Sequence, residues 1–383
     1  MTNPISTTTL EHPTPTTPPK RQKHRHHITE EHHHSLLPGL PDDIAHLCLS
    51  RVPPSTLYSV CHSWRRLIYS PSFPPFLSLY ALCLPTKPQT HLSNPINFFS
   101  FDPISCNWQS LPPPPPLRFL FRHPSFISRK LPIQTAAVSE NLVLLAATDD
   151  SFLPALSQPL VFNPTSKKWS HAPPLASARR WCAAGAVEGA VYVASGIGSH
   201  YHTDVARSVE KWDLTNTATY RWERMGMLKD GRFSRDAIEA VGWRGKLCMV
   251  NVKGVAAKEG VIYDVVTDTW TEMPEGMVAG WRGPAAAMAE ESLYVVDECK
   301  GLLKMYDHVR DTWVGVAEDE RLKGAQQVAA AGGRVCVLKG DGGGVTVVDV
   351  VAPPLGRVWE VEAPAGFQAV GIHILPRLSN SDF

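Results

Sequence analysis

Hydrophobic positions in the C-terminal three quarters of the chain fall into short runs that are separated by turn residues. In WCAAGAVEGAVYVASG (181–196), two runs of small apolar residues flank Glu188 and Gly189. Comparable pairs of runs recur at 237–250, 285–296 and 328–338. Paired runs of this length with a turn between them are typical of antiparallel β-strands. The pattern therefore predicts a mainly β protein that is built from a repeated unit.

Each pair of runs is accompanied by a second motif, in which an aromatic or apolar residue and an Asp are followed by a Trp. The clearest copies are VIYDVVTDTW (261–270) and KMYDHVRDTW (304–313). The closing tryptophans recur at a nearly regular interval, and they are Trp108, Trp169, Trp222, Trp270, Trp313 and Trp359. We expect the Asp to accept hydrogen bonds from turn amides and the Trp to pack between adjacent sheets.

The mean interval between these tryptophans, about 50 residues, is that of kelch repeats, and the units resemble them. The Gly-Gly doublet that usually ends the second strand is degraded here and survives as Ser195-Gly196. Six Trp positions indicate a kelch-type β-propeller of six blades. The C-terminal run AVGIHIL (369–375) is expected to supply a closing strand that joins the last blade to the first.

The segment LPGLPDDIAHLCLSRVPPSTLYSVCHSWRRLIYSPSF (37–73) follows a different pattern. Ile44, Leu47 and Cys48 form an apolar stripe with helical spacing, and Asp42 and Asp43 lie in what would be the first helical turn. Two or three short amphipathic helices are predicted. Because so short a segment forms only a small core, it needs a partner or a neighbouring domain.

This segment resembles an F-box, by which substrate receptors dock onto the Skp-type adaptor of cullin–RING ubiquitin ligases. The matched residues are Leu40, Pro41, Asp42, Ile44, Arg51, Val52, Pro53, Val60, Cys61, Trp64, Arg65, Leu67 and Ile68. The stretch PSTLYS (54–59) is shorter than the usual connection of the family. The resemblance implies an adaptor-binding surface formed by Leu40, Pro41, Asp42, Ile44, Leu47, Val60, Cys61 and Trp64.

An F-box followed by kelch repeats resembles the plant F-box/kelch-repeat proteins. The resemblance implies a non-catalytic substrate receptor of an SCF-type ubiquitin ligase, with a Skp-type adaptor, a cullin and a protein substrate as partners. One subgroup of that family directs phenylpropanoid and flavonoid enzymes, including chalcone synthase, to degradation, and we expect a target of this kind. The alternative function is a kelch binding scaffold without a link to ubiquitination. Separately, residues 37–73 could be an ordinary helical cap on the propeller.

The expected organisation is a disordered tail (1–34), an F-box (35–82), a linker (83–94), the propeller (95–377) and a short tail (378–383). Residues 1–34 are rich in Thr, Pro and His and poor in aromatic and branched apolar residues, so they cannot offset the entropy lost on ordering. KRQKHRHH (20–27) could be a nuclear-import patch and HHH (32–34) a metal ligand. A solvated tail is the favoured interpretation.

Charge and composition exclude several functions. A formal net charge of +1 gives no general attraction to nucleic acid, and no apolar run is long enough to cross a membrane. The eight Cys are scattered singly, which favours a reducing compartment, the cytoplasm or the nucleus or both. There is no Gly-rich phosphate loop, H-E-x-x-H motif or Ser nucleophile elbow. We therefore expect no enzyme activity, no cofactor and no metal site.

Basic residues recur just before the first strand of four of the units. Arg180 and Arg282 precede Tyr192 and Tyr294 by the same interval, and Arg235 and Lys323 precede Cys248 and Cys336 by an interval one position longer. Three aromatic residues lie close to these arginines, namely Trp181, Phe233 and Trp281. Because Arg and aromatic residues are favoured at interface hot spots, we predict that Arg180, Trp181, Phe233, Arg235, Trp281 and Arg282 bind the substrate. Alternatively, these residues bond neighbouring blade loops.

Overall fold

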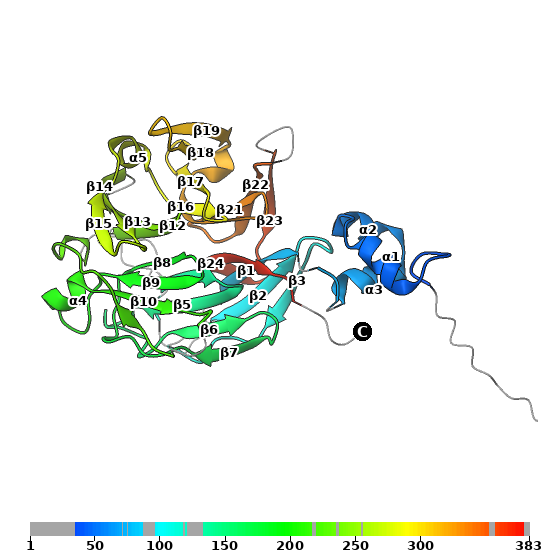
Figure 1. Cartoon of the computed structure of the whole chain (residues 1–383), viewed down its shortest axis with the longest axis horizontal. Helices are drawn as coiled ribbons and strands as arrows, with labels where there is room; N and C mark the ends of the chain where they lie inside the picture. Colours follow the sequence, from blue (N-terminus) through cyan, green and yellow to red (C-terminus); the bar gives the residue numbers. More distant parts are fainter. Residues whose placement is uncertain are drawn as a thin grey trace, which may run out of the picture.

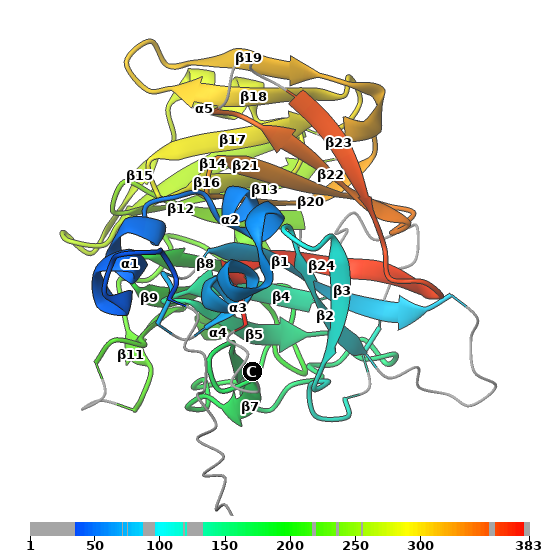
Figure 2. The same ribbon diagram turned by 90° about the vertical axis from the view of Figure 1, so that its right-hand side faces the viewer.

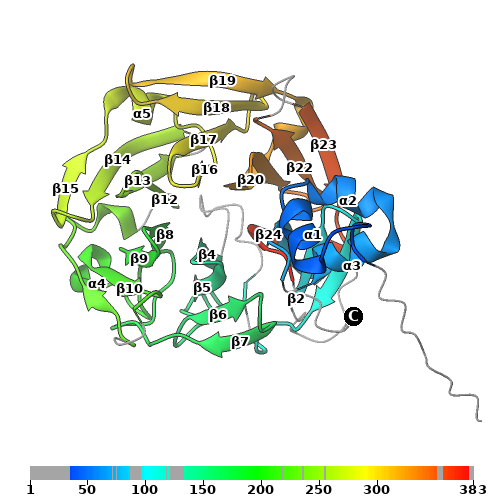
Figure 3. The ribbon, with the colours of Figure 1, turned by 45° about the vertical axis from the view of Figure 1, so that its right-hand side comes forward.

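The computed structural model describes residues 35–70, 72–74, 76–86, 96–117, 119–120, 133–216, 220–234, 237–253, 256–351 and 357–378. The predicted disordered tail and Arg235 lie outside these residues. Six four-stranded antiparallel sheets surround a central channel, as Figure 3 shows. The chain is thus a six-bladed propeller, as the Trp spacing predicts.

Each blade is one sheet, numbered here from its innermost strand outwards. Blade 1 contains β24 (Phe367–Pro376), β1 (Leu77–Pro85), β2 (Asn97–Asp102) and β3 (Asn107–Leu111). Blade 2 contains β4 (Ile133–Val138), β5 (Asn141–Ala147), β6 (Leu160–Asn163) and β7 (Lys168–His171). Blade 3 contains β8 (Ala183–Val187), β9 (Ala190–Ala194), β10 (Val209–Asp213) and β11 (Glu223–Arg224).

The remaining blades follow the same order. Blade 4 contains β12 (Ala237–Trp243), β13 (Lys246–Lys253), β14 (Ala256–Asp264) and β15 (Thr269–Glu272). Blade 5 contains β16 (Ala285–Met288), β17 (Ser292–Asp297), β18 (Leu302–Asp307) and β19 (Thr312–Glu318). Blade 6 contains β20 (Ala325–Ala331), β21 (Arg334–Lys339), β22 (Gly344–Asp349) and β23 (Arg357–Glu362). Short helix α4 (Thr203–Arg207) lies in the β9–β10 loop of blade 3, and α5 (Glu275–Gly280) lies in the connection from blade 4 to blade 5.

The ring is closed by the C-terminal strand. β24 pairs antiparallel with β1, with Ala81 opposite Ile372, so the innermost strand of blade 1 comes from the far end of the chain. The prediction of a closing strand at 369–375 is confirmed. Because no chain end is left as an open sheet edge, closure protects the first and last blades from pairing with other molecules.

The predicted start of the propeller at residue 95 is wrong, because β1 begins at Leu77. The sequence interpretation assigned residues 77–82 to the F-box and 83–85 to the linker. LSLYALCLP is a nearly continuous apolar run, and periodicity alone cannot separate a fully buried strand from a buried helix. β24 and β2 flank this strand, which explains its nearly complete burial. Residues 87–95 lie outside the described part of the chain.

The repeated Asp acts in the turn between the third and fourth strands. Asp264 accepts hydrogen bonds from the main-chain N–H groups of Val266 (3.1 Å) and Thr267 (3.0 Å). A carboxylate or amide oxygen makes the same type of contact at the equivalent position of every other blade, in Asp102, Asn163, Asp213, Asp307 and Asp349. The motif therefore fixes the turn that leads into the outermost strand, as predicted.

The repeated Trp joins neighbouring blades. Trp270 Nε1 of blade 4 donates to the carbonyl of Gly226, just beyond the outermost strand of blade 3, over 2.9 Å. Four other tryptophans make the same type of bond to the preceding blade, namely Trp108, Trp169, Trp222 and Trp313. Trp359 instead lies against the guanidinium groups of Arg334 and Arg357, 5.6 and 5.9 Å from its ring centre. The repeated Asp and Trp are therefore structural.

Three helices precede the propeller: α1 (Asp42–Leu49), α2 (Pro54–Val60) and α3 (His62–Tyr69). We call residues 35–73 the helical module. It lies over blade 1 on one face of the ring (Figures 1 and 2), where Ile104 of the β2–β3 turn packs against its core. This proximal face is where β24 ends, since the N–H of Arg377 donates to the carbonyl of Phe76 over 2.8 Å. The innermost strands all run the same way and begin on the opposite, distal face.

Candidate adaptor and substrate surfaces

The helical module has a small, well-formed core. Leu49, Leu57, Leu67 and Ile68, one or two from each helix, are buried together with Phe73. Trp64 is half-buried against this cluster, and its indole Nε1 donates to the carbonyl of Leu36 over 2.8 Å. The chain before α1 is thereby fixed to α3. Trp64, predicted to contact the adaptor, contributes to the module's own packing.

A second set of apolar side chains in the module faces solvent. Leu40, Ile44, Leu47 and Val60 are 40, 42, 60 and 55% exposed. Pro41, Asp42 and Cys61 are exposed as well. All seven are among the residues that the F-box resemblance assigns to adaptor binding. Large apolar side chains gathered on so small a module are typical of a protein-binding surface.

The acidic start of α1 also has a structural function. The Oδ1 atom of Asp42 accepts a hydrogen bond from the N–H of Leu36 over 3.0 Å. Asp42 and Asp43 both lie in the first turn of α1, where negative charge is favoured by the helix dipole. Asp42 thus holds the chain before α1 in place beside Leu40 and Pro41, while its side chain stays at the surface.

On the distal face, Arg180 and Trp181 lie together at the start of β8. The guanidinium carbon of Arg180 is 4.1 Å from the centre of the Trp181 ring, a cation–π geometry. Trp181 has a φ of +58°, which is rare for a bulky residue and indicates local strain. Both side chains are partly exposed. Burial lowers the pKa of Arg180, and Asp149 partly counteracts this effect.

The other residues that were predicted to contact the substrate differ in their exposure to solvent. Arg282 is exposed at the distal face, before β16. Phe233 and Trp281 are fully buried, so their prediction as binding residues is wrong for this conformation. Trp281 packs edge-on against Trp313, with ring centres 6.0 Å apart. The sequence shows these aromatic residues close to an arginine, but it does not show that they point into the layer between blades.

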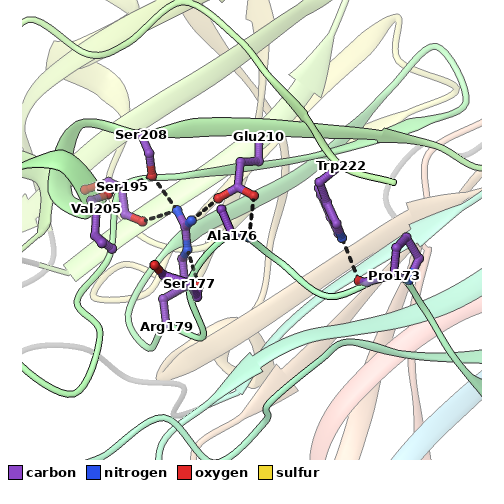
Figure 4. Close-up of polar contacts among 9 residues, drawn as sticks. All are labelled: Pro173, Ala176, Ser177, Arg179, Ser195, Val205, Ser208, Glu210 and Trp222. Atoms are coloured by element: carbon purple, nitrogen blue, oxygen red, sulfur yellow. Dashed lines mark hydrogen bonds and ion pairs between the residues drawn. The ribbon is translucent and has the colours of Figure 1, made fainter. Parts of the chain in front are cut away.

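An ion pair that the sequence interpretation missed lies directly beside Arg180. Figure 4 shows Arg179 paired with Glu210 of β10, both almost completely buried. The guanidinium group also donates to Ser208 Oγ (2.7 Å) and to the carbonyl of Ser195 (3.2 Å), and Glu210 Oε2 accepts from the N–H of Ala176 (2.9 Å). Arg179 thus joins the chain before β8 to the sheet of blade 3. Because its partner lies on the third strand of that sheet, no local motif could have indicated the pair.

The central channel contains a cavity of about 430 Å³. Its walls are mostly Ala, Gly and Val of the innermost strands, with Gln134, Glu239 and His373 among the polar residues. Burial lowers the pKa of His373 to about 4. Among the residues that the structure describes, no three His, Cys, Asp or Glu side chains are grouped as metal ligands, and all eight Cys are free thiols. No helix in the described ranges is long and apolar enough to cross a membrane.

These features define a six-bladed propeller with an N-terminal three-helix module that exposes apolar side chains. No family model matches the chain. The F-box/kelch-repeat protein SKIP25 of Arabidopsis thaliana is 52% identical over 363 residues, which cover 91% of each chain. The F-box protein AFR of the same plant is 26% identical over 282 residues (69% of this chain, 68% of AFR), and F-box/kelch-repeat protein SKIP4 is 22% identical over 311 residues (75 and 77%). The chain belongs to the F-box/kelch-repeat family.

Proposed function

We propose that this protein is the substrate receptor of an SCF-type ubiquitin ligase and acts in the cytosol or the nucleus. The helical module binds the Skp-type adaptor, which connects it to the cullin, and the propeller binds a protein target. The observation that carries this proposal is the exposure of Leu40, Ile44, Leu47 and Val60 on a module whose own core is already complete.

Burial of these side chains against an adaptor supplies the driving force for docking. Full burial of a Leu or Ile side chain contributes about 1.5–3 kcal/mol. Four apolar residues, each already partly covered, can together supply several kcal/mol. This offsets a substantial part of the entropic cost of association. Charged residues in their place would have to be desolvated without a partner, so they should prevent docking.

The test replaces Ile44 and Leu47 by Asp. We expect the double variant to lose co-purification with the Skp-type adaptor and the cullin, with a decrease in adaptor affinity of at least 100-fold. Val309→Asp is the matched control, because Val309 is an 81% exposed apolar residue on a blade turn. If the double variant binds the adaptor like the control, the docking surface is wrong. If the unmodified protein binds target but no adaptor, the protein is a kelch scaffold outside ubiquitination.

We further propose that the target binds the distal face through Arg180, Trp181 and Arg282, with Arg235 remaining a prediction from the sequence. The supporting observations are the partly exposed Arg180–Trp181 pair and the exposed Arg282. This face lies opposite the helical module, so a bound target would not compete with the adaptor for the same surface. A phenylpropanoid or flavonoid enzyme such as chalcone synthase is the first target to test.

Targets can be recovered by affinity purification under proteasome inhibition and identified by mass spectrometry. Replacing Arg180 and Arg282 by Ala should stabilise such a target in cells by several-fold while adaptor binding stays unchanged. Arg357→Ala, which removes an exposed arginine of β23, is the control. Degradation at the normal rate in the double variant would place recognition elsewhere on the propeller.

A further inference from the structure

The connection between the helical module and blade 1 is short, and two parts of the chain that are distant in sequence contact it or the end of the helix before it. Only residues 70–76 lie between the end of α3 at Tyr69 and the start of β1 at Leu77. These parts are the β2–β3 turn and the residue that follows β24. A flexible tether would show none of these contacts.

Arg377, the first residue after the closing strand, lies at the centre of this connection. It is 8% exposed, and its Nη2 atom donates to the carbonyl of Ser70 over 3.1 Å. Its guanidinium carbon lies 5.6 Å from the ring centre of Tyr69 and 4.9 Å from that of Phe76. With the main-chain bond to Phe76, Arg377 holds both ends of the connecting segment.

The β2–β3 turn also contacts the module. The hydroxyl of Tyr69 donates to Oδ2 of Asp102, whose Oδ1 accepts the N–H of Ile104 over 2.9 Å. Ile104 packs against the module's apolar cluster. The equivalent turn residues of blades 4, 5 and 6 are 83, 81 and 66% exposed, and they are Val266, Val309 and Val351. The module therefore covers an apolar turn position that is open to solvent in those blades.

We infer that Arg377 is a positioning residue that fixes the orientation of the helical module relative to the propeller. Because Arg377 directly follows β24, formation of the closed ring also places its side chain against the module. The closure of the ring and the orientation of the module are then established together. Resting on the proposed function, this coupling sets the direction in which the distal face is presented to the rest of the ligase, and thereby selects the lysines that receive ubiquitin.

The orientation can be measured without adaptor or target. Spin labels on Cys48 of α1 and Cys299 of the β17–β18 turn report the distance between module and distal face, once the other exposed thiols, Cys61 and Cys106, are changed to Ser. We expect one narrow distance distribution. It should become at least twofold broader in Arg377→Gln and in Ile104→Ser.

Two matched controls separate positioning from general damage. Val309→Ser removes the residue equivalent to Ile104, and Arg357→Gln removes an arginine that lies against an aromatic ring; both should keep the narrow distribution. Should Arg377→Gln fail to fold, Phe76→Leu removes one of the two rings against which the Arg377 guanidinium lies, while Tyr69→Phe and Ile104→Ser test the contacts of the β2–β3 turn. A broad distribution in the parent, or a narrow one in all junction variants, would overturn the inference.

The consequence for transfer is tested in a reconstituted ligase, with the propeller's own lysines as the acceptors. Arg377→Gln should keep the parent's adaptor affinity but distribute ubiquitin over more propeller lysines, as mapped by mass spectrometry. An unchanged modification map would overturn the role in lysine selection. If the parent protein does not bind the adaptor at all, the proposed function fails, and the label distances still decide whether Arg377 fixes the module.

Discussion

In the helical module five buried side chains form the core while Leu40, Ile44, Leu47 and Val60 remain exposed on the same small module. In the blades most apolar side chains are buried between neighbouring sheets, and exposed ones such as Val266 and Val309 lie singly on separate turns. The polar contacts of the blades, unlike those of the module, repeat from unit to unit. The turn before the outermost strand is held by an Asp side chain, or by Asn163 in blade 2, and five tryptophans bond a neighbouring blade. A region whose apolar side chains are mostly buried within the protein is suited to be a scaffold. A region that leaves a group of apolar side chains exposed is suited to bind a partner.

Opening the ring should have the largest effect, because it exposes blade surfaces that are buried in the intact propeller. Removal of residues 366–383 deletes β24, so the innermost strand of blade 1 and its register with β1 are lost. We expect the truncated chain to aggregate, because β1 and the inner strand of blade 6 become exposed. Size-exclusion chromatography and thermal unfolding provide the measurement. A soluble truncated chain with an unchanged melting temperature would show that closure does not depend on β24.

Breaking the buried ion pair in blade 3 should have the next largest effect. Arg179→Met leaves the carboxylate of Glu210 buried without its cation, which costs about 3–5 kcal/mol of unfolding free energy. Arg179→Met combined with Glu210→Leu should recover most of this loss, since neither charge is then buried. Urea unfolding measures both variants. An equal loss in the single and double variants would mean that packing, rather than the unpaired charge, determines the cost.

Acid should weaken the closing strand through His373. Its pKa of about 4 in the folded protein lies below the ordinary value near 6.5, so the folded state favours the neutral ring. This stabilising contribution is complete above pH 6.5 and is lost as the pH falls towards 4, by about 3 kcal/mol in total. His373→Asn should remove that part of the pH dependence in urea unfolding at pH 7 and pH 4.5. Identical pH dependence in the two proteins would contradict the assignment.

Local repeats explain why much of the architecture could be predicted from the sequence. The Trp spacing predicts six blades, because each copy of the motif lies within one short segment and the copies can be counted. The apolar run near the C-terminus predicts the closing strand for the same reason. The first strand at 77–85 could not be assigned in the same way. Its pairing partner β24 lies at the opposite end of the propeller sequence, and only that partner distinguishes a strand in blade 1 from an extension of the F-box.

The residues of the candidate sites were harder to predict for the same reason, because their contacts also depend on distant parts of the chain. Spacing placed Arg180 and Arg282 at the start of innermost strands, but it could not separate surface from interior for Phe233 and Trp281. The direction of a side chain depends on which neighbouring blade it meets. Arg179 adjoins Arg180, but its ion pair cannot be predicted from the sequence, because only the fold brings Glu210 beside it.

The indole bonds between blades also determine how local damage spreads. In an open array of repeats, the terminal units have one neighbour and are free to fray first. Here the bond from Trp108 of blade 1 to the carbonyl of Glu362 in blade 6 joins the two ends of the series. Blades 5 and 6 pack against each other through an apolar cluster that includes Tyr294, Val328 and Val337. Every blade therefore has two neighbours, and the series has no terminal unit at which unfolding can start. The stability of one blade is shared around the circle, so the propeller should unfold as a single cooperative unit.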